Sequence, residues 1–130
     1  MASPSKDVLD LVAIGGFGTF KTNLFYARVL DKPDNLICFF DIGEFKSSDA
    51  QVGESYPLVQ ILLRVDKTTG YDVAFSKMRA IRNYLTGHGA VTVDGTRYAG
   101  FWVYSDITFI GYDTGERKNF VMVLRMICDI

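Results

Sequence analysis

Residues 55–88 read SYPLVQILLRV, DKTTG and YDVAFSKMRAIRNYLTGH in succession, and they carry the clearest structural pattern in the chain. Its first part alternates along the chain as a β-strand does. One side of the expected strand is wholly aliphatic: Val59, Ile61, Leu63 and Val65. The other side is mixed: Leu58, Gln60, Leu62 and Arg64. We therefore predict a strand over 56–65 with one side in a core and the other partly exposed or against another subunit.

The last part of the stretch is typical of an amphipathic helix. Its apolar residues recur at helical spacing and form a single stripe: Tyr71, Ala74, Met78, Ile81 and Leu85. Thr69 is the expected N-cap, with Asp72 completing a capping box, and Gly87 is expected to end the helix. Three basic side chains lie mostly off the apolar stripe: Lys77, Arg79 and Arg82.

The residues before this stretch predict a short helix, a connector and a buried strand. Ser3 or Ser5 can cap the helix, which two glycines end near residue 15. Residues 14–23, IGGFGTFKTN, contain Lys21 and Thr22 after several glycines. A phosphate-binding loop needs glycine directly before the lysine, and Phe20 stands there instead. We expect a flexible connector, and keep a small nucleotide- or nucleic-acid-binding domain as an alternative.

Polar residues mark a turn and a long interruption on either side of the expected strand at 36–42. The turn contains Pro33, Asp34 and Asn35, and the strand ends near Asp41 and Gly43. Residues 43–55 have no periodicity, and loops of this length are uncommon in compact domains. We predict a flexible loop or an arm that orders against a partner.

The remaining chain predicts antiparallel strands. Asp94-Gly95 between β-forming residues is a strong hairpin signal, and a second turn is expected at 112–115 between strands at 101–110 and 119–127. The predicted fold class is α+β. We expect one domain over residues 1–130, with a mainly antiparallel sheet, one long helix and a short N-terminal helix.

Composition narrows the function classes. The formal net charge is −1, which gives no global attraction to nucleic acid or anionic membranes. Cys38 and Cys128 lie in apolar runs and are expected as buried free thiols. With one histidine, His88, and no catalytic or metal-binding motif, we expect no enzyme, no metal and no cofactor. Neither a signal peptide nor a membrane-spanning run is evident, so folding in cytoplasm is expected.

Several short motifs occur in a fixed order along the chain. They are Asn23-Leu24-Phe25, Pro33-Asp34-Asn35, Asp41 with Gly43, Val59-Gln60-Ile61 with Arg64, the helix with Tyr71, Ala74 and Leu85, then Ile110-Gly111-Tyr112-Asp113, Gly115, Arg117 and Asn119-Phe120. This order resembles the tail terminator, or tail completion, family of long-tailed bacteriophages, some members of which are labelled minor capsid proteins. The resemblance spans roughly residues 9–127. Glu44 departs from it, since the family often has a second glycine there.

The resemblance implies a structural virion protein at the junction of tail and neck, assembled in the host bacterial cytoplasm. Such proteins form a ring, typically of six subunits, that caps the tail tube, ends tube polymerisation and offers a docking face to the head–tail connector. The implied partners are further copies of the chain, the major tail tube protein and a neck protein. Genome DNA passes through the lumen without specific binding. A head-completion or neck connector protein is the nearest alternative.

The candidate contact residues fall into two groups. Contact with the tube or another partner is expected from the 43–55 arm and the two hairpin tips: Phe45, Lys46, Val52, Asp94, Gly95, Asp113 and Gly115. Contact with neighbouring subunits, or a place on the lumen, is expected for five others: Gln60, Arg64, Lys77, Arg79 and Arg82. Five motif residues are expected to be structural: Pro33, Asp34, Asn35, Asp41 and Gly43.

Overall fold

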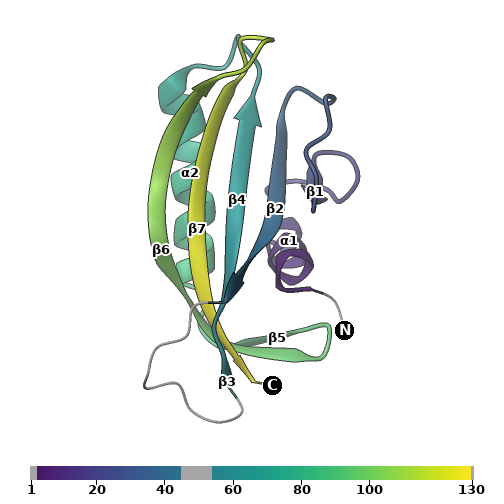
Figure 1. Ribbon diagram of the computed structural model, residues 1–130, viewed down its shortest axis with the longest axis vertical. Coiled ribbons are helices and arrows are strands. Elements are labelled where there is room, and N and C mark those ends of the chain that lie inside the picture. Colours follow the sequence, from purple (N-terminus) through teal and green to yellow (C-terminus); the bar gives the residue numbers. More distant parts are fainter. Residues whose placement is uncertain (1–2, 45–53, 130) are drawn as a thin grey trace.

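A computed structural model describes residues 3–44 and 54–129 and has two helices on one face of a curved sheet (Figure 1). The elements in chain order are α1 (Pro4–Ile14), β1 (Leu24–Tyr26), β2 (Leu36–Glu44), β3 (Glu54–Ser55), β4 (Pro57–Val65), α2 (Tyr71–Thr86), β5 (Val91–Val93), β6 (Thr96–Tyr112) and β7 (Lys118–Asp129). This arrangement confirms the predicted α+β class.

The sheet is almost entirely antiparallel. Its strand order is β1-β2-β4-β7-β6-β5, with β3 pairing beside β4 onto β7. Among the strands of the described residues, only β1 runs parallel to its neighbour, β2. The central strand β4 pairs with β2 on one side and β7 on the other, so the strand predicted over 56–65 lies in the middle of the sheet.

The core lies between the helices and one face of this sheet. The aliphatic side of β4, the Phe120–Met126 alternation of β7 and the α2 stripe form one buried cluster. Ala74, Met78, Ile81 and Leu85 are each at most 1% exposed. Tyr71, predicted in the same stripe, is 43% exposed and packs its ring against Phe75, Phe109 and Phe120 near the edge of the core.

The start of α2 differs from the prediction. Gly70 is the N-cap and makes no side-chain capping bond, so the expected Thr69–Asp72 capping box is wrong. Thr69 instead donates its hydroxyl to Asp66 Oδ1 at 2.8 Å. The Asp66 carboxylate therefore organises the turn before the helix, and the first N–H groups of α2 receive no side-chain cap.

Two polar contacts fix α1 on the sheet. Ser3 caps the helix, and Ser5 donates from its N–H and hydroxyl to the Asp41 carboxylate at 2.9 and 2.7 Å. Buried Asp7 accepts a hydrogen bond from the hydroxyl of buried Tyr98. Burial raises the pKa of the Asp7 carboxyl. Asp41, one of the motif residues, thus ties the end of β2 to the N-terminus of α1.

The remaining turns and the cysteines follow their sequence signals. Asp94 and Gly95 both have positive φ, 47° and 81°, as the type I′ hairpin requires. Gly43, at φ 104°, lies in the β-bulge that ends the β2–β4 ladder. The strands expected at 96–98 and 101–110 are one continuous strand, β6, because bulges absorb the break near Gly100.

Both cysteines are buried free thiols, and burial raises the pKa of Cys38 to about 11.

Candidate assembly surfaces

The sheet face opposite the helices, here called the open face, carries several apolar side chains. One row across four strands places Phe40, Gln60, Val123 and Ser105 side by side. Phe40, Gln60 and Val123 are only half-buried. In the next row towards the C-terminal end of β7, the Arg125 guanidinium lies 5.5 Å from the ring centre of Trp102. Apolar surface of this kind marks a contact site more often than a solvated face.

Part of the open face is covered by the chain itself. Residues 27–34, between β1 and β2, cross the β2–β4 side of the face. Beneath them is a second small apolar cluster built on Leu36, Cys38 and Leu62. The second side of β4, expected to be partly exposed or against another subunit, is therefore partly covered by the chain itself.

Arg64 holds this covering segment in place. Its Nη2 lies 2.7 Å from the carbonyl oxygens of Leu30 and Pro33 and 3.0 Å from that of Asp31, and its Nε donates to Asp34 O at 3.2 Å. The side chain is 3% exposed. Arg64 is a candidate for the subunit interface or the lumen, and within the subunit its Nε and Nη2 groups bind backbone carbonyls of the same chain.

Arg117 supports the same segment from the β6–β7 turn. Its Nε donates to Asp113 Oδ2 at 2.8 Å, and its other nitrogens reach Asp31 and Asp34. Burial acts to raise the pKa of Asp113, but hydrogen bonds from backbone N–H groups and Arg117 outweigh it and the pKa is lowered. The pKa of Asp34 is lowered chiefly by its hydrogen bond from Lys32. Asp113 is thus a turn-stabilising residue as well as a tip residue.

Asp66 joins the 31–35 turn to the turn before α2. Asn35 Nδ2 donates to Asp66 Oδ2 at 3.1 Å, and Asp66 N donates to Asn35 Oδ1 at 2.8 Å. Hydrogen bonds from the side chains of Thr69, Thr68 and Asn35 lower the pKa of Asp66 well below its usual range. The motif residues Pro33, Asp34 and Asn35 therefore all lie in one hydrogen-bonded end of the molecule.

This network predicts an acid-sensitive end of the fold. A carboxylate whose pKa is lowered by folding contributes its full stabilisation above its unfolded pKa of about 4, and the contribution is lost as the pH falls from that value through the lower folded pKa. We expect Asp66→Ala to lower the melting temperature at pH 7 and to have a clearly smaller effect near pH 2. Thermal denaturation by circular dichroism across this range measures the difference. Asp72→Ala is the control, and an equal loss at both pH values would contradict the network.

The two hairpin tips lie at opposite ends of the sheet. The β5–β6 tip with Asp94 and Gly95 is at the end that holds the chain termini, and the β6–β7 tip with Asp113 and Gly115 is at the other end (Figure 1). The candidate axial residues are thus not one site. They form two separate ends, as contacts with two different partners require.

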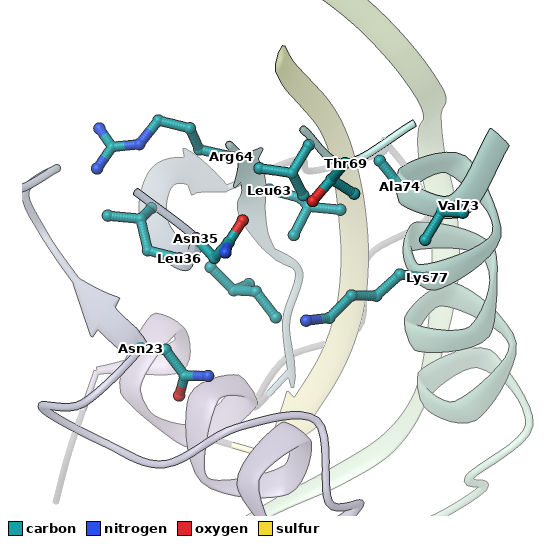
Figure 2. Close-up of a pocket in the computed structure, with 11 residues that line it drawn as sticks. Asn23, Asn35, Leu36, Leu63, Arg64, Thr69, Val73, Ala74 and Lys77 are labelled. Carbon is teal, nitrogen blue, oxygen red and sulfur yellow. The ribbon is translucent and has the colours of Figure 1, made fainter. Parts of the chain in front are cut away.

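The basic residues of α2 have three different environments. Arg82 Nη1 forms an ion pair with Asp106 Oδ1 at 2.8 Å, and Arg79 lies over the Phe75 ring at 5.0 Å. Lys77 lines a pocket of about 250 Å³ between α2 and the turn before β1. Figure 2 shows Lys77 extending from α2 towards Leu36, while the Arg64 side chain points away from the pocket. The three residues do not form one basic patch.

The outer edge of β6 is a further candidate surface. β5 pairs with only Thr96–Tyr98, and no other strand among the described residues pairs with that side of β6. Ile110 and Tyr112 on this strand are 57% and 64% exposed. Unpaired strand edges readily accept another chain. Sequence patterns did not reveal this surface because they do not show which strand lies at an edge.

Three predicted contact residues, Phe45, Lys46 and Val52, lie outside the described residues. Within 3–44 and 54–129, no cluster of three or more His, Cys, Asp or Glu side chains could hold a metal ion. Neither described helix is long and apolar enough to cross a membrane. The connector at 14–23 follows the C-terminal end of α1 and leads into β1, so no helix N-terminus faces Lys21 and Thr22 as in a phosphate-binding loop.

Comparison with solved structures shows that the same fold occurs in a chain of a virion particle. A chain of the virion of a native gene transfer agent particle superposes with a TM-score of 0.66 at 15% identity, over 98% of this chain and 96% of that one. No curated protein sequence matches the chain. At this identity the superposition establishes the architecture only.

A family model establishes the group to which the sequence belongs. The model described as bacteriophage tail terminator protein matches residues 11–130. The chain belongs to the bacteriophage tail terminator protein family, and is thereby a structural protein of the phage virion. The resemblance drawn from the ordered motifs is confirmed.

Proposed function

We propose that the protein forms a six-subunit ring that caps the tail tube and ends its polymerisation. The proposal is supported by the half-buried row of Phe40, Gln60 and Val123 on the open face, where a partner surface would remove further apolar area from water. A closed ring needs two different patches on each subunit. The open face and the exposed edge of β6 supply apolar and backbone contacts of different kinds.

The two ends of the sheet are the proposed axial contacts. One end carries Asp94 and Gly95 and the other carries Asp113 and Gly115, so one end is available to the major tail tube protein and the other to the head–tail connector. Gln60 is proposed at the subunit interface, and Lys77, Arg79 and Arg82 at the interface or the lumen. Genome DNA would pass through the lumen without base-specific contacts. Assembly in the host cytoplasm is part of this proposal.

The oligomeric state tests the ring directly. Native mass spectrometry of the purified protein should show a closed species of six 14.6-kDa subunits. A protein that stays monomeric and does not bind tail tubes would rule out the proposal. A ring that binds only connector or head proteins would assign the chain to the neck instead, which labelling at the tube end distinguishes.

The arm between β2 and β3 is proposed to contact a neighbour or the tube. Deleting residues 45–52, which include Phe45 and Lys46, should reduce ring or tube binding at least about tenfold while leaving the melting temperature nearly unchanged. Analytical ultracentrifugation and thermal denaturation measure the two effects. As a control, the same number of Gly and Ser residues replaces the segment. Normal assembly of the variant that lacks residues 45–52 would show that the arm has no role in assembly.

A further inference from the structure

β1 lies at the sheet edge opposite β6 (Figure 1). A basic and aromatic hollow is lined by residues of β1 and of the turns on either side of it. Its volume is about 340 Å³, and its lining residues are Phe20, Lys21, Phe25, Tyr26, Arg28 and Leu30. The Phe20 and Tyr26 rings lie with their centres 5.9 Å apart, and Lys21 Nζ is 5.6 Å from the Phe20 ring centre. The hollow thus joins an aromatic wall to cationic side chains.

The turn that carries Lys21 is held by its own hydrogen bonds. Thr19 N donates to Asn23 Oδ1 at 2.7 Å, and Lys21 N donates to Leu24 O at 3.0 Å. Lys21 has a backbone φ of 68°, a value that residues other than glycine seldom adopt. Such a backbone persists only where its surroundings fix it, and it often marks a functional position.

The part of the hollow that carries Arg28 is fixed by hydrogen bonds to β2. Ala27 N donates to Phe39 O at 2.9 Å, and Cys38 Sγ donates to Arg28 O at 3.0 Å. Ala27 has a φ of 74°, so non-glycine residues with positive φ occur on both sides of the hollow. The carbonyls just beyond are bound by Arg64. The two cations are therefore presented by rigid turns rather than by loose loops.

The charges indicate what the hollow accepts. Lys21 and Arg28 are exposed and form no ion pair among the described residues, whereas nearby Lys6 pairs with Asp10. We infer that this hollow docks an acidic segment with an apolar side chain from a different protein of the particle. A second copy of the chain is a poor source of it, because no two acidic residues of the sequence are closer than three positions apart, so the chain has no dense acidic segment. This inference goes beyond the ring and does not depend on it.

A peptide suits the hollow better than duplex DNA does. Binding to duplex DNA rests on rows of cations that neutralise many phosphates, and only two unpaired cations line this site. The hollow has room for one or two side chains, and its aromatic wall gives an apolar side chain a contact that phosphates do not use. Charged pairs at such a rim mainly set specificity and salt dependence.

Fluorescence anisotropy with a short labelled peptide of alternating glutamate and leucine tests the inference. The full-length protein should bind this peptide, with an affinity that falls as salt rises, and should bind a lysine–leucine peptide, ATP and duplex DNA much more weakly. Arg28→Glu should weaken binding by about tenfold, and Lys21→Glu with Arg28→Glu further still. Lys67→Glu reverses an exposed charge elsewhere and should leave affinity unchanged.

Each outcome bears on the inference alone. Equal binding by wild type and the double variant, no binding by wild type, or tighter binding to ATP or DNA would overturn it. The native mass of the same variants distinguishes an effect on peptide binding from an effect on oligomer formation, because charge reversal at this edge should leave the oligomer intact. If a variant lost both the oligomer and peptide binding, Arg28 would belong to the subunit interface. That result would overturn the docking of a different protein.

Discussion

Replacing Arg64 with alanine is expected to lower the free energy of unfolding by about 3 kcal/mol. The guanidinium is the shared donor for the carbonyl groups of residues 30, 31, 33 and 34, and it is 3% exposed. Alanine leaves these acceptors without a partner and removes the support of the segment over Cys38 and Leu62. Urea denaturation followed by fluorescence measures the loss.

Two further variants make the result specific to the hydrogen bonds. Arg64→Lys keeps the charge but cannot reach four carbonyls from one ammonium, so it should recover only part of the loss. Arg79→Ala removes an exposed arginine that lies over Phe75 and should change stability by no more than about 0.5 kcal/mol. Equal stability of Arg64→Ala and wild type would show that the hydrogen bonds of Arg64 do not hold residues 27–34 in place.

Placing a charge at Val123 is expected to abolish the ring while the subunit stays folded. Val123 is at the middle of the uncovered row, between Gln60 and Ser105. In the monomer a glutamate there can reach water, but in a covered interface it would be buried without a partner, at a cost of several kcal/mol. We expect Val123→Glu to weaken subunit association at least about hundredfold. Native mass spectrometry across a dilution series measures this change.

A matched substitution on an exposed strand position controls for the added charge. Thr92→Glu on β5 places the same side chain where it remains solvated, so the ring should persist. Thermal denaturation of both variants establishes that each is folded. Rings of unchanged stability in Val123→Glu would show that the open face is not the subunit interface, and would favour the free edge of β6 instead.

Local pattern was enough to predict most of the fold. Strict alternation in 56–65 and the helical spacing of Ala74, Met78 and Ile81 are properties of adjacent residues, and they remain valid once the chain folds. The Asp94-Gly95 turn was predictable for the same reason, since its dihedral angles depend on two residues. The ordered motifs added the family, which composition and periodicity do not contain.

What the sequence did not show were contacts between distant segments. Arg64 has the spacing of a surface residue, and only the fold reveals the carbonyls of 30–34 above it. The Ser5–Asp41 and Asp7–Tyr98 hydrogen bonds join residues 36 and 91 positions apart. Thr69 fits a capping pattern, yet its hydroxyl donates a hydrogen bond to Asp66 and does not cap the helix.

Electron microscopy of the purified protein, alone and mixed with tail tubes, tests the central claim most directly. We expect six-fold rings in the protein alone and a ring at the end of each tube in the mixture, with further tube growth stopped. Monomers in the first sample, together with bare tube ends that continue to grow in the second, would contradict it.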